Sequence, residues 1–127
     1  STPPFSAPKR EPKMIAIIFE VMPAEGQKDA YLDIAATMRP LVEQVEGFIS
    51  VERFQSLTNP DKLLSISFFE DEDAVLRWRK LAGHRNAQSK GRNGIFSDYH
   101  LRVCHVIRDY GMFDRDEAPP DSRAAHD

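Results

Sequence analysis

The sequence lacks several features that would each define a class of protein. It has one cysteine among its 127 residues, so an internal disulfide is excluded and a reducing compartment fits. Its longest apolar run, residues 14–19, is strand-sized and falls short of the roughly 18 residues of a membrane helix, and no secretory signal precedes it. The formal net charge is −3, so general nucleic-acid binding gains no support. We therefore expect a cytoplasmic protein that binds neither nucleic acid nor membranes.

Composition divides the chain into three parts. Hydrophobic residues make up 41% and charged residues 29%, which is typical of a folded domain. Residues 1–13 are rich in proline, which lacks a backbone donor, so we expect a flexible arm there. Residues 112–127 are predicted to form a charged C-terminal tail. One folded domain is therefore predicted over residues 14–111.

Apolar residues at steps of three or four predict two helices. The first covers residues 27–46 and should kink or break near Arg39, because Pro40 removes one backbone hydrogen bond. The second begins after Asp71, which can cap it, and halts at Gly83, with one or two further helical turns beyond. The apolar stripe of the first helix consists of Tyr31, Ile34, Ala35, Met38, Leu41, Val42 and Val45.

Alternating, β-branched and aromatic residues predict four strands, over residues 14–22, 48–57, 62–70 and 99–109. Turn-forming residues join the second and third strands into an antiparallel hairpin. The full order is strand, helix, strand, strand, helix, strand. This order predicts an α+β, ferredoxin-like βαββαβ fold, a four-stranded antiparallel sheet with both helices on one face.

Three of the four strands are apolar on both sides. The first has Glu20 as its only charge, and the third places Ile66 and Phe68 opposite Phe69. Two helices cover only one sheet face, and an uncovered apolar face would exceed the patch that a monomer tolerates. We therefore predict a homodimer whose two sheets stack into a barrel-like core. The alternative, a monomer with its tails folded over the sheet, is weakened by the polarity of those tails.

A metal site is not predicted. His100, Cys104 and His105 are close in sequence, but residues four apart on a strand are separated by about 13 Å, too far for one ion. Cys104 and His105 should also point to opposite faces. Cys104 lies mid-strand among apolar positions, which favours a small buried filler over a nucleophile.

The strongest candidate for chemistry is the pair Trp78 and His84. Trp78 lies on the inner stripe of the second helix, where a tryptophan is more often part of the core than of a site. His84 follows the expected end of that helix, near the opening between helices and sheet. That position favours ligand contact or proton transfer.

Three polar residues interrupt hairpin strands that otherwise look buried: Arg53, Ser65 and Ser67. Buried polar groups need partners, so a cavity, water or a ligand is one interpretation. Outward-facing polar positions are an equally good one.

Taken together, these segments resemble the antibiotic biosynthesis monooxygenase family of the dimeric α/β-barrel superfamily, over about residues 14–111. The matching segments are IIFEVMPAEGQKDAYLDIA, GFISVERFQS, LSISFFEDEDAVLRW and residues 84–110, the last with the skeleton HRNAQSKGR, Phe96, Asp98-Tyr99 and Arg108-Asp109-Tyr110. Trp78 occupies the place of a tryptophan that the family commonly carries on this helix, followed by His84.

The resemblance implies a homodimer with an apolar cavity between sheet and helices in each subunit. Some relatives oxygenate aromatic polyketides or quinols with dioxygen and without metal or flavin, the substrate supplying the electrons. The expected activity is therefore a cofactor-independent monooxygenase reaction on a small aromatic or quinol-type compound. The alternative is a non-catalytic dimeric small-molecule-binding or stress-related protein. The expected site consists of His84 as the catalytic group, with Trp78, Arg53, Phe96, Ser65 and Ser67 binding the substrate and no metal.

Haem degradation is disfavoured. Haem-degrading relatives use an asparagine on the first strand and a histidine further along the helical segment that holds this tryptophan. Here the first strand offers Glu20, and the segment after His84 offers Gln88.

Overall fold

The computed structural model describes residues 14–88 and 94–126, with the backbone alone described for residues 84–88, 125 and 126. The predicted order of strands and helices is confirmed, and the arm predicted over residues 1–13 lies outside the described residues. The elements are β1 (Ile15–Pro23), α1 (Lys28–Val42), β2 (Phe48–Gln55), β3 (Leu63–Phe69), α2 (Glu72–Gln88), β4 (Phe96–His105) and α3 (Pro120–His126).

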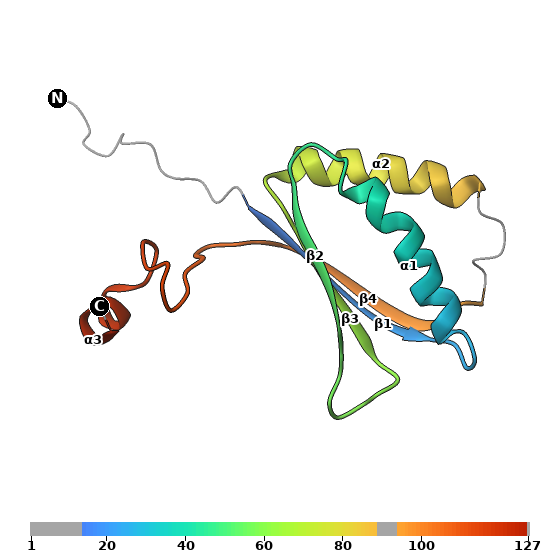
Figure 1. Cartoon of the computed structure of the whole chain (residues 1–127), viewed down its shortest axis with the longest axis horizontal. Helices are drawn as coiled ribbons and strands as arrows, with labels where there is room; N and C mark the ends of the chain where they lie inside the picture. The colour runs from blue at the N-terminus through green and yellow to red at the C-terminus, as the bar shows by residue number, and fades with distance from the viewer. Residues whose placement is uncertain (1–13, 89–93, 127) are drawn as a thin grey trace.

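The four strands form one antiparallel sheet in the order β2-β3-β1-β4. Helices α1 and α2 lie on the same face of this sheet (Figure 1). This is the ferredoxin-like α+β fold that the order of the elements predicted. No helix within the described residues is long and apolar enough to cross a membrane.

The core between helices and sheet consists of two separate clusters. In one, Ile15 and Phe69, which are partners across β1 and β3, pack against Ala74 and Val75 of α2. The other cluster lies at the opposite end of the same strands and consists of Val21, Tyr31, Leu63 and Ile95. Each cluster removes several large apolar side chains from water, which is the main stabilising contribution in a domain of this size.

The helices differ from their predictions in three respects. α1 ends at Val42, whereas the prediction extended it to residue 46. α1 continues through Pro40, so the helix does not break near Arg39, and the alternative, a kink there, stays a prediction. Because Pro40 has no backbone N–H, the backbone carbonyl of Ala36 has no helical hydrogen-bond donor. Ala36 is exposed, so water can solvate this carbonyl. α2 likewise continues through Gly83 to Gln88 and does not halt there, since a helical glycine costs only about 1 kcal/mol relative to alanine.

The C-terminal segment, which the composition predicts to be a charged tail, contains a short helix. It ends in α3, which the sequence pattern did not predict, and it projects away from the two larger helices (Figure 1). Arg115 holds the segment together: its guanidinium donates to the Ser122 hydroxyl (2.7 Å) and lies 5.5 Å from the centroid of the Tyr110 ring. Ala118 is buried within the segment.

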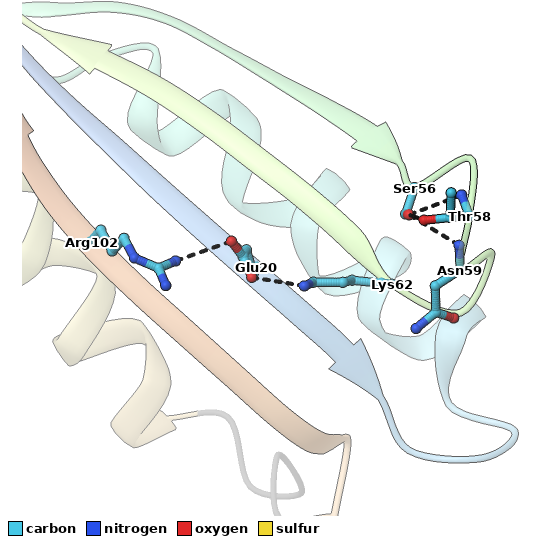
Figure 2. A network of polar contacts seen from close by, with 6 residues as sticks. All are labelled: Glu20, Ser56, Thr58, Asn59, Lys62 and Arg102. Atoms are coloured by element: carbon cyan, nitrogen blue, oxygen red, sulfur yellow. Dashed lines mark hydrogen bonds and ion pairs between the residues drawn. The ribbon is translucent and has the colours of Figure 1, made fainter.

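The sheet face opposite the helices is apolar along the middle of its two central strands, β1 and β3, and carries charges on both outer strands and toward one end. Ile18 and Ile66 are cross-strand partners on this face, and both are half-buried in the single chain. Glu20 binds Lys62 (2.9 Å), the residue before β3, and Arg102 (3.0 Å) of β4, as Figure 2 shows. We call this surface the open face.

The Glu20 carboxylate is held in its charged form by these two cations. Its pKa lies below the ordinary value of 4.5, chiefly because Lys62 donates a hydrogen bond to it and secondarily because of the charges of Lys62 and Arg102. Close to Lys62, the hairpin loop is closed by the Ser56 hydroxyl, which accepts from the Asn59 backbone N–H (3.1 Å; Figure 2).

Candidate functional site

The helix-facing side of β3 explains where the fold leaves space. Four of its residues alternate onto this side: Leu63 and Phe69 are large and belong to the two core clusters, whereas Ser65 and Ser67 lie between them. Two small polar residues cannot fill the volume that leucine or phenylalanine fills. The core is therefore interrupted above the middle of β3, under the helices.

A cavity of about 230 Å³ occupies this interruption. β3 contributes Ser65, and its partner in the sheet register, Arg53 of β2, lies beside it. Trp78 of α2 forms another part of the wall. The rest of the lining is mostly apolar and comes from β1, α1 and the chain entering β4: Phe19, Tyr31, Ile34, Ala35, Met38, Ile95 and Phe96.

One end of the cavity is an aromatic cluster. The Phe96 ring is packed edge-on against Phe19 (6.1 Å between centroids), Tyr31 (5.8 Å) and Tyr99 (5.9 Å). Such edge-to-face pairs stabilise each other beyond simple burial, by about 0.5–1.5 kcal/mol. They give the cavity a rigid, flat-sided wall suited to an aromatic or alicyclic ligand.

The other end of the cavity carries its only described charge, the Arg53 guanidinium. Arg53 is half-buried, and its Nε atom is shielded from solvent without a hydrogen-bond partner among the described residues. A smaller hollow of about 90 Å³ adjoins this end and shares Arg53, Ser65 and Trp78 with the cavity, and Ser67 lines it. The charge of the site and its two serine hydroxyls thus lie close together.

The structure brings together five of the six residues that the sequence singled out. Trp78, Arg53, Phe96 and Ser65 line the main cavity, and Ser67 lines the adjoining hollow. That they bind a substrate remains a prediction. The side chain of the sixth residue, His84, lies outside the described residues; its backbone belongs to α2, because the helix does not end at Gly83.

Other lining residues were missed as site residues. Tyr31, Ala35 and Met38 were assigned to the apolar stripe of the first helix, which is correct, but a stripe does not distinguish a packed surface from the wall of a cavity. The serines of β3, placed between two large apolar residues on the same side, were the signal that could have connected that stripe to a cavity.

A second hollow, of about 190 Å³, lies on the open face beside the hairpin and is lined by Glu20, Phe54 and Lys62 among others. It is the weaker candidate, because its charged residues are already paired with each other. Within the described residues no group of three or more His, Cys, Asp or Glu side chains could hold a metal ion. The Nε2 atom of His105 lies 3.6 Å from the Oε1 atom of Glu72, and both side chains are exposed.

Comparisons with known proteins agree with this architecture. The antibiotic biosynthesis monooxygenase family profile matches residues 14–90. The chain is 48% identical over 93 residues to the jasmonate monooxygenase ABM of Pyricularia oryzae, which covers 73% of this chain but only 43% of that relative. It is 30% identical over 98 residues to protein YqjZ of Bacillus subtilis, covering 77% of this chain and 83% of YqjZ.

A solved structure shares the fold. The cofactor-independent oxygenase SnoaB of Streptomyces nogalater superposes with a TM-score of 0.61 at 11% identity, covering 76% of this chain and 96% of SnoaB. Identity this low shows likeness of fold alone. The family profile and the two relatives carry the assignment further: the chain belongs to the antibiotic biosynthesis monooxygenase family.

Proposed function

We propose that this protein is a monooxygenase that oxidises a small aromatic or quinol-type compound with dioxygen in the cavity beneath α1 and α2. The observation that carries the proposal is the cavity itself, an aromatic-walled space of about 230 Å³ whose one described charge, Arg53, lies at one end beside the serines of β3. Family membership supports oxygenation as the reaction, and the names of the fungal relative and of SnoaB agree with it.

The proposed chemistry uses electrons of the substrate. In an anthrone, for example, two C–H bonds of a methylene group break and a carbonyl forms. One atom of dioxygen enters the carbonyl and the other leaves as water, so the substrate reduces the dioxygen completely. A base must first take the proton of the ionising substrate, and we assign this role to His84.

The cavity would then bind and shield the reactive substrate. The rings of Phe19, Phe96 and Trp78 would hold a flat molecule and keep water away from it. A dry cavity strengthens every electrostatic contact with the substrate and protects an ionised intermediate from protonation by solvent.

One observation favours a second candidate, a binding protein without catalysis. The described lining of the cavity contains no histidine, carboxylate or cysteine, so no described side chain there is an ordinary base at neutral pH. If His84 does not reach the substrate, the cavity can hold a small molecule without ionising it.

Oxygen uptake distinguishes these candidates. A panel of anthrones and dihydroquinones, with jasmonate added because of the fungal relative's name, is incubated with the protein in an oxygen-electrode cell. Turnover that is lost in His84→Ala supports the monooxygenase and the role of His84. Binding of panel compounds without oxygen uptake supports the binding protein and contradicts the monooxygenase.

A matched pair of variants tests whether this cavity is the site. Ala35 is buried in its wall, whereas the next residue of α1, Ala36, is exposed. Ala35→Leu adds three carbons to the cavity and should abolish turnover and ligand binding, while Ala36→Leu should change neither. Equal activity of the two variants, both folded by circular dichroism, would place the site elsewhere.

We also propose that the protein is a homodimer formed through the open face. Ile18, Ile66 and Phe68 make its centre apolar, and Phe54 remains 44% exposed at its edge. A second copy that covers this area would remove it from water.

Light scattering coupled to size exclusion tests the dimer. Ile66→Asp should convert it to a monomer, since a carboxylate would be buried in the interface without a partner. Leu76→Asp makes the same change at an exposed position of α2 and should leave the dimer intact. A wild-type protein that stays monomeric at micromolar concentration would refute the proposal.

A further inference from the structure

Arg53 is the one charged residue in the described lining of the cavity, and its guanidinium group lacks hydrogen-bond partners. Its Nε atom is fully shielded from solvent and has no hydrogen-bond partner among the described residues. Leaving a buried donor of a charged group without a partner is costly, and such groups in folded proteins normally have one. No other atom of the guanidinium forms a hydrogen bond or ion pair with a described residue, so a partner for the part of Arg53 that lines the cavity has to come from outside the described chain.

No acidic side chain takes this place. The described linings of the cavity and of the adjoining hollow contain no aspartate or glutamate, and Arg53 forms no ion pair with a described acidic residue. Two other arginines of the domain have acidic partners: Arg39 pairs with Glu43, and Arg102 pairs with Glu20. The described lining of the cavity is thus largely apolar, with an unbalanced positive charge at one end.

The ligand supplies the missing negative charge. We propose that the cavity selects small carboxylic acids, with the ligand carboxylate bound to the Arg53 guanidinium. Guanidinium and carboxylate match in planar, two-pronged geometry, and the Ser65 hydroxyl beside Arg53 in the register can donate a further hydrogen bond. The apolar body of the ligand would pack against the aromatic cluster at the other end.

The number of charges and the size of the cavity narrow the ligand class. One cation balances a monoanion, whereas a phosphate dianion would leave a buried charge unmatched. A volume of about 230 Å³ lies below the range of about 300–1,000 Å³ that is usual for drug-sized ligands. A compact aromatic or alicyclic monocarboxylate fits both limits. The inference rests on the proposed function only in taking this cavity as the substrate site.

Calorimetric titration with two matched probes tests the inference. 3-Phenylpropanoate and 3-phenylpropanamide have the same ring and chain and differ in charge. At pH 7 the wild type should bind the carboxylate about tenfold to a hundredfold more tightly than the amide, the range expected for a charge-assisted hydrogen bond. In Arg53→Gln the two affinities should agree within about twofold.

Two further variants serve as controls. Arg79→Gln removes the same charge from an exposed position of α2 and should keep the wild-type preference for the carboxylate. Arg53→Lys keeps the charge without the planar fork and should show an intermediate preference, which also covers the case in which Arg53→Gln does not fold. Thermal unfolding with the carboxylate present gives an independent readout, a rise in Tm in the wild type that Arg53→Gln lacks.

Three results would overturn the inference: equal affinity of the wild type for both probes, a carboxylate preference that survives in Arg53→Gln, or no carboxylate binding at millimolar concentration. The proposed oxygenase fails separately. Carboxylate binding through Arg53 without oxygen uptake by any compound would keep the inference and contradict the oxygenase. Oxygen uptake with neutral compounds, in a protein without carboxylate preference, would do the reverse.

Discussion

Gly47 controls how closely α2 can approach the sheet. It precedes β2 with a backbone φ of +93°, in the left-handed region, and a Cβ atom at this position would lie 2.6 Å from the Cβ atom of Ala74. Its carbonyl also accepts a hydrogen bond from the Glu70 backbone N–H (2.7 Å). Because Ala74 lies on the same helix as Trp78, this contact helps to fix the wall of the cavity.

The cost of Gly47→Ala has two parts. The left-handed conformation costs an alanine about 1–2 kcal/mol. The contact with Ala74 is far shorter than van der Waals distance and adds about 1–3 kcal/mol, as overpacking of a core does. The free energy of unfolding should therefore fall by about 2–5 kcal/mol.

Gly26 is the matched control, because its φ is +77° and nothing lies within 4 Å of the position of its Cβ atom. Gly26→Ala should cost only the conformational part, about 1–2 kcal/mol. Urea unfolding at one fixed protein concentration measures both variants, so that association contributes equally.

A double-mutant cycle isolates the contact itself. Ala74→Gly removes the atom that would clash, so Gly47→Ala should cost about 1–3 kcal/mol less in that background than in the wild type. A coupling energy within about 0.5 kcal/mol of zero, or a Gly47→Ala variant no less stable than Gly26→Ala, would refute the reasoning.

The remaining predictions concern the core, the open face and α1. Phe69→Ala should lower the free energy of unfolding in urea by about 3–5 kcal/mol, whereas Leu57→Ala, at a 99% exposed position, should change it by less than about 0.5 kcal/mol. The pKa of Glu20 in the folded protein lies below 4.5. The Glu20 carboxylate therefore stabilises the fold fully above pH 4.5, and this stabilisation is lost as the pH falls below that value. Tm measured from pH 6 to pH 3 should thus fall more for the wild type than for Glu20→Gln. Pro40→Ala restores a donor to the Ala36 carbonyl and should raise the free energy of unfolding in urea by about 1–2 kcal/mol, so an unchanged or lower value would show that the proline is already accommodated.

The sequence predicted the fold well, because periodicity in the strands and helices records which side of each element is buried. The prediction was wrong at residues whose type is compatible with more than one local structure, such as the inside or the end of a helix. Gly83 is tolerated inside α2 although glycine often ends helices, and Pro40 is tolerated near the end of α1. α3 was missed because no apolar stripe marks it, and Arg115 holds its segment through polar contacts.

The candidate site was predictable in its polar part and not in its apolar part. Arg53 and Ser65 stood out because polar residues on otherwise apolar strands require an explanation. Tyr31 and Met38 did not stand out, because an apolar residue facing a sheet looks the same whether it touches a neighbour or borders a space. Whether it borders a space depends on the size of the residues that face it from another strand or helix. A pattern within one segment of sequence does not contain this information.

This dependence links the site to the stability of the fold. Ser65 and Ser67 occupy positions where leucine or phenylalanine would join the two core clusters into one, and burying a large apolar side chain is worth about 1.5–3 kcal/mol. The shielded, unpaired Nε of Arg53 further reduces stability. A chain selected for stability alone would fill this space and exchange the arginine. Because the unfilled space and the arginine without an acidic partner lie in one cavity, and the same anionic, apolar ligand would fill the space and balance the charge, the arrangement is better explained by ligand binding than by imperfect packing.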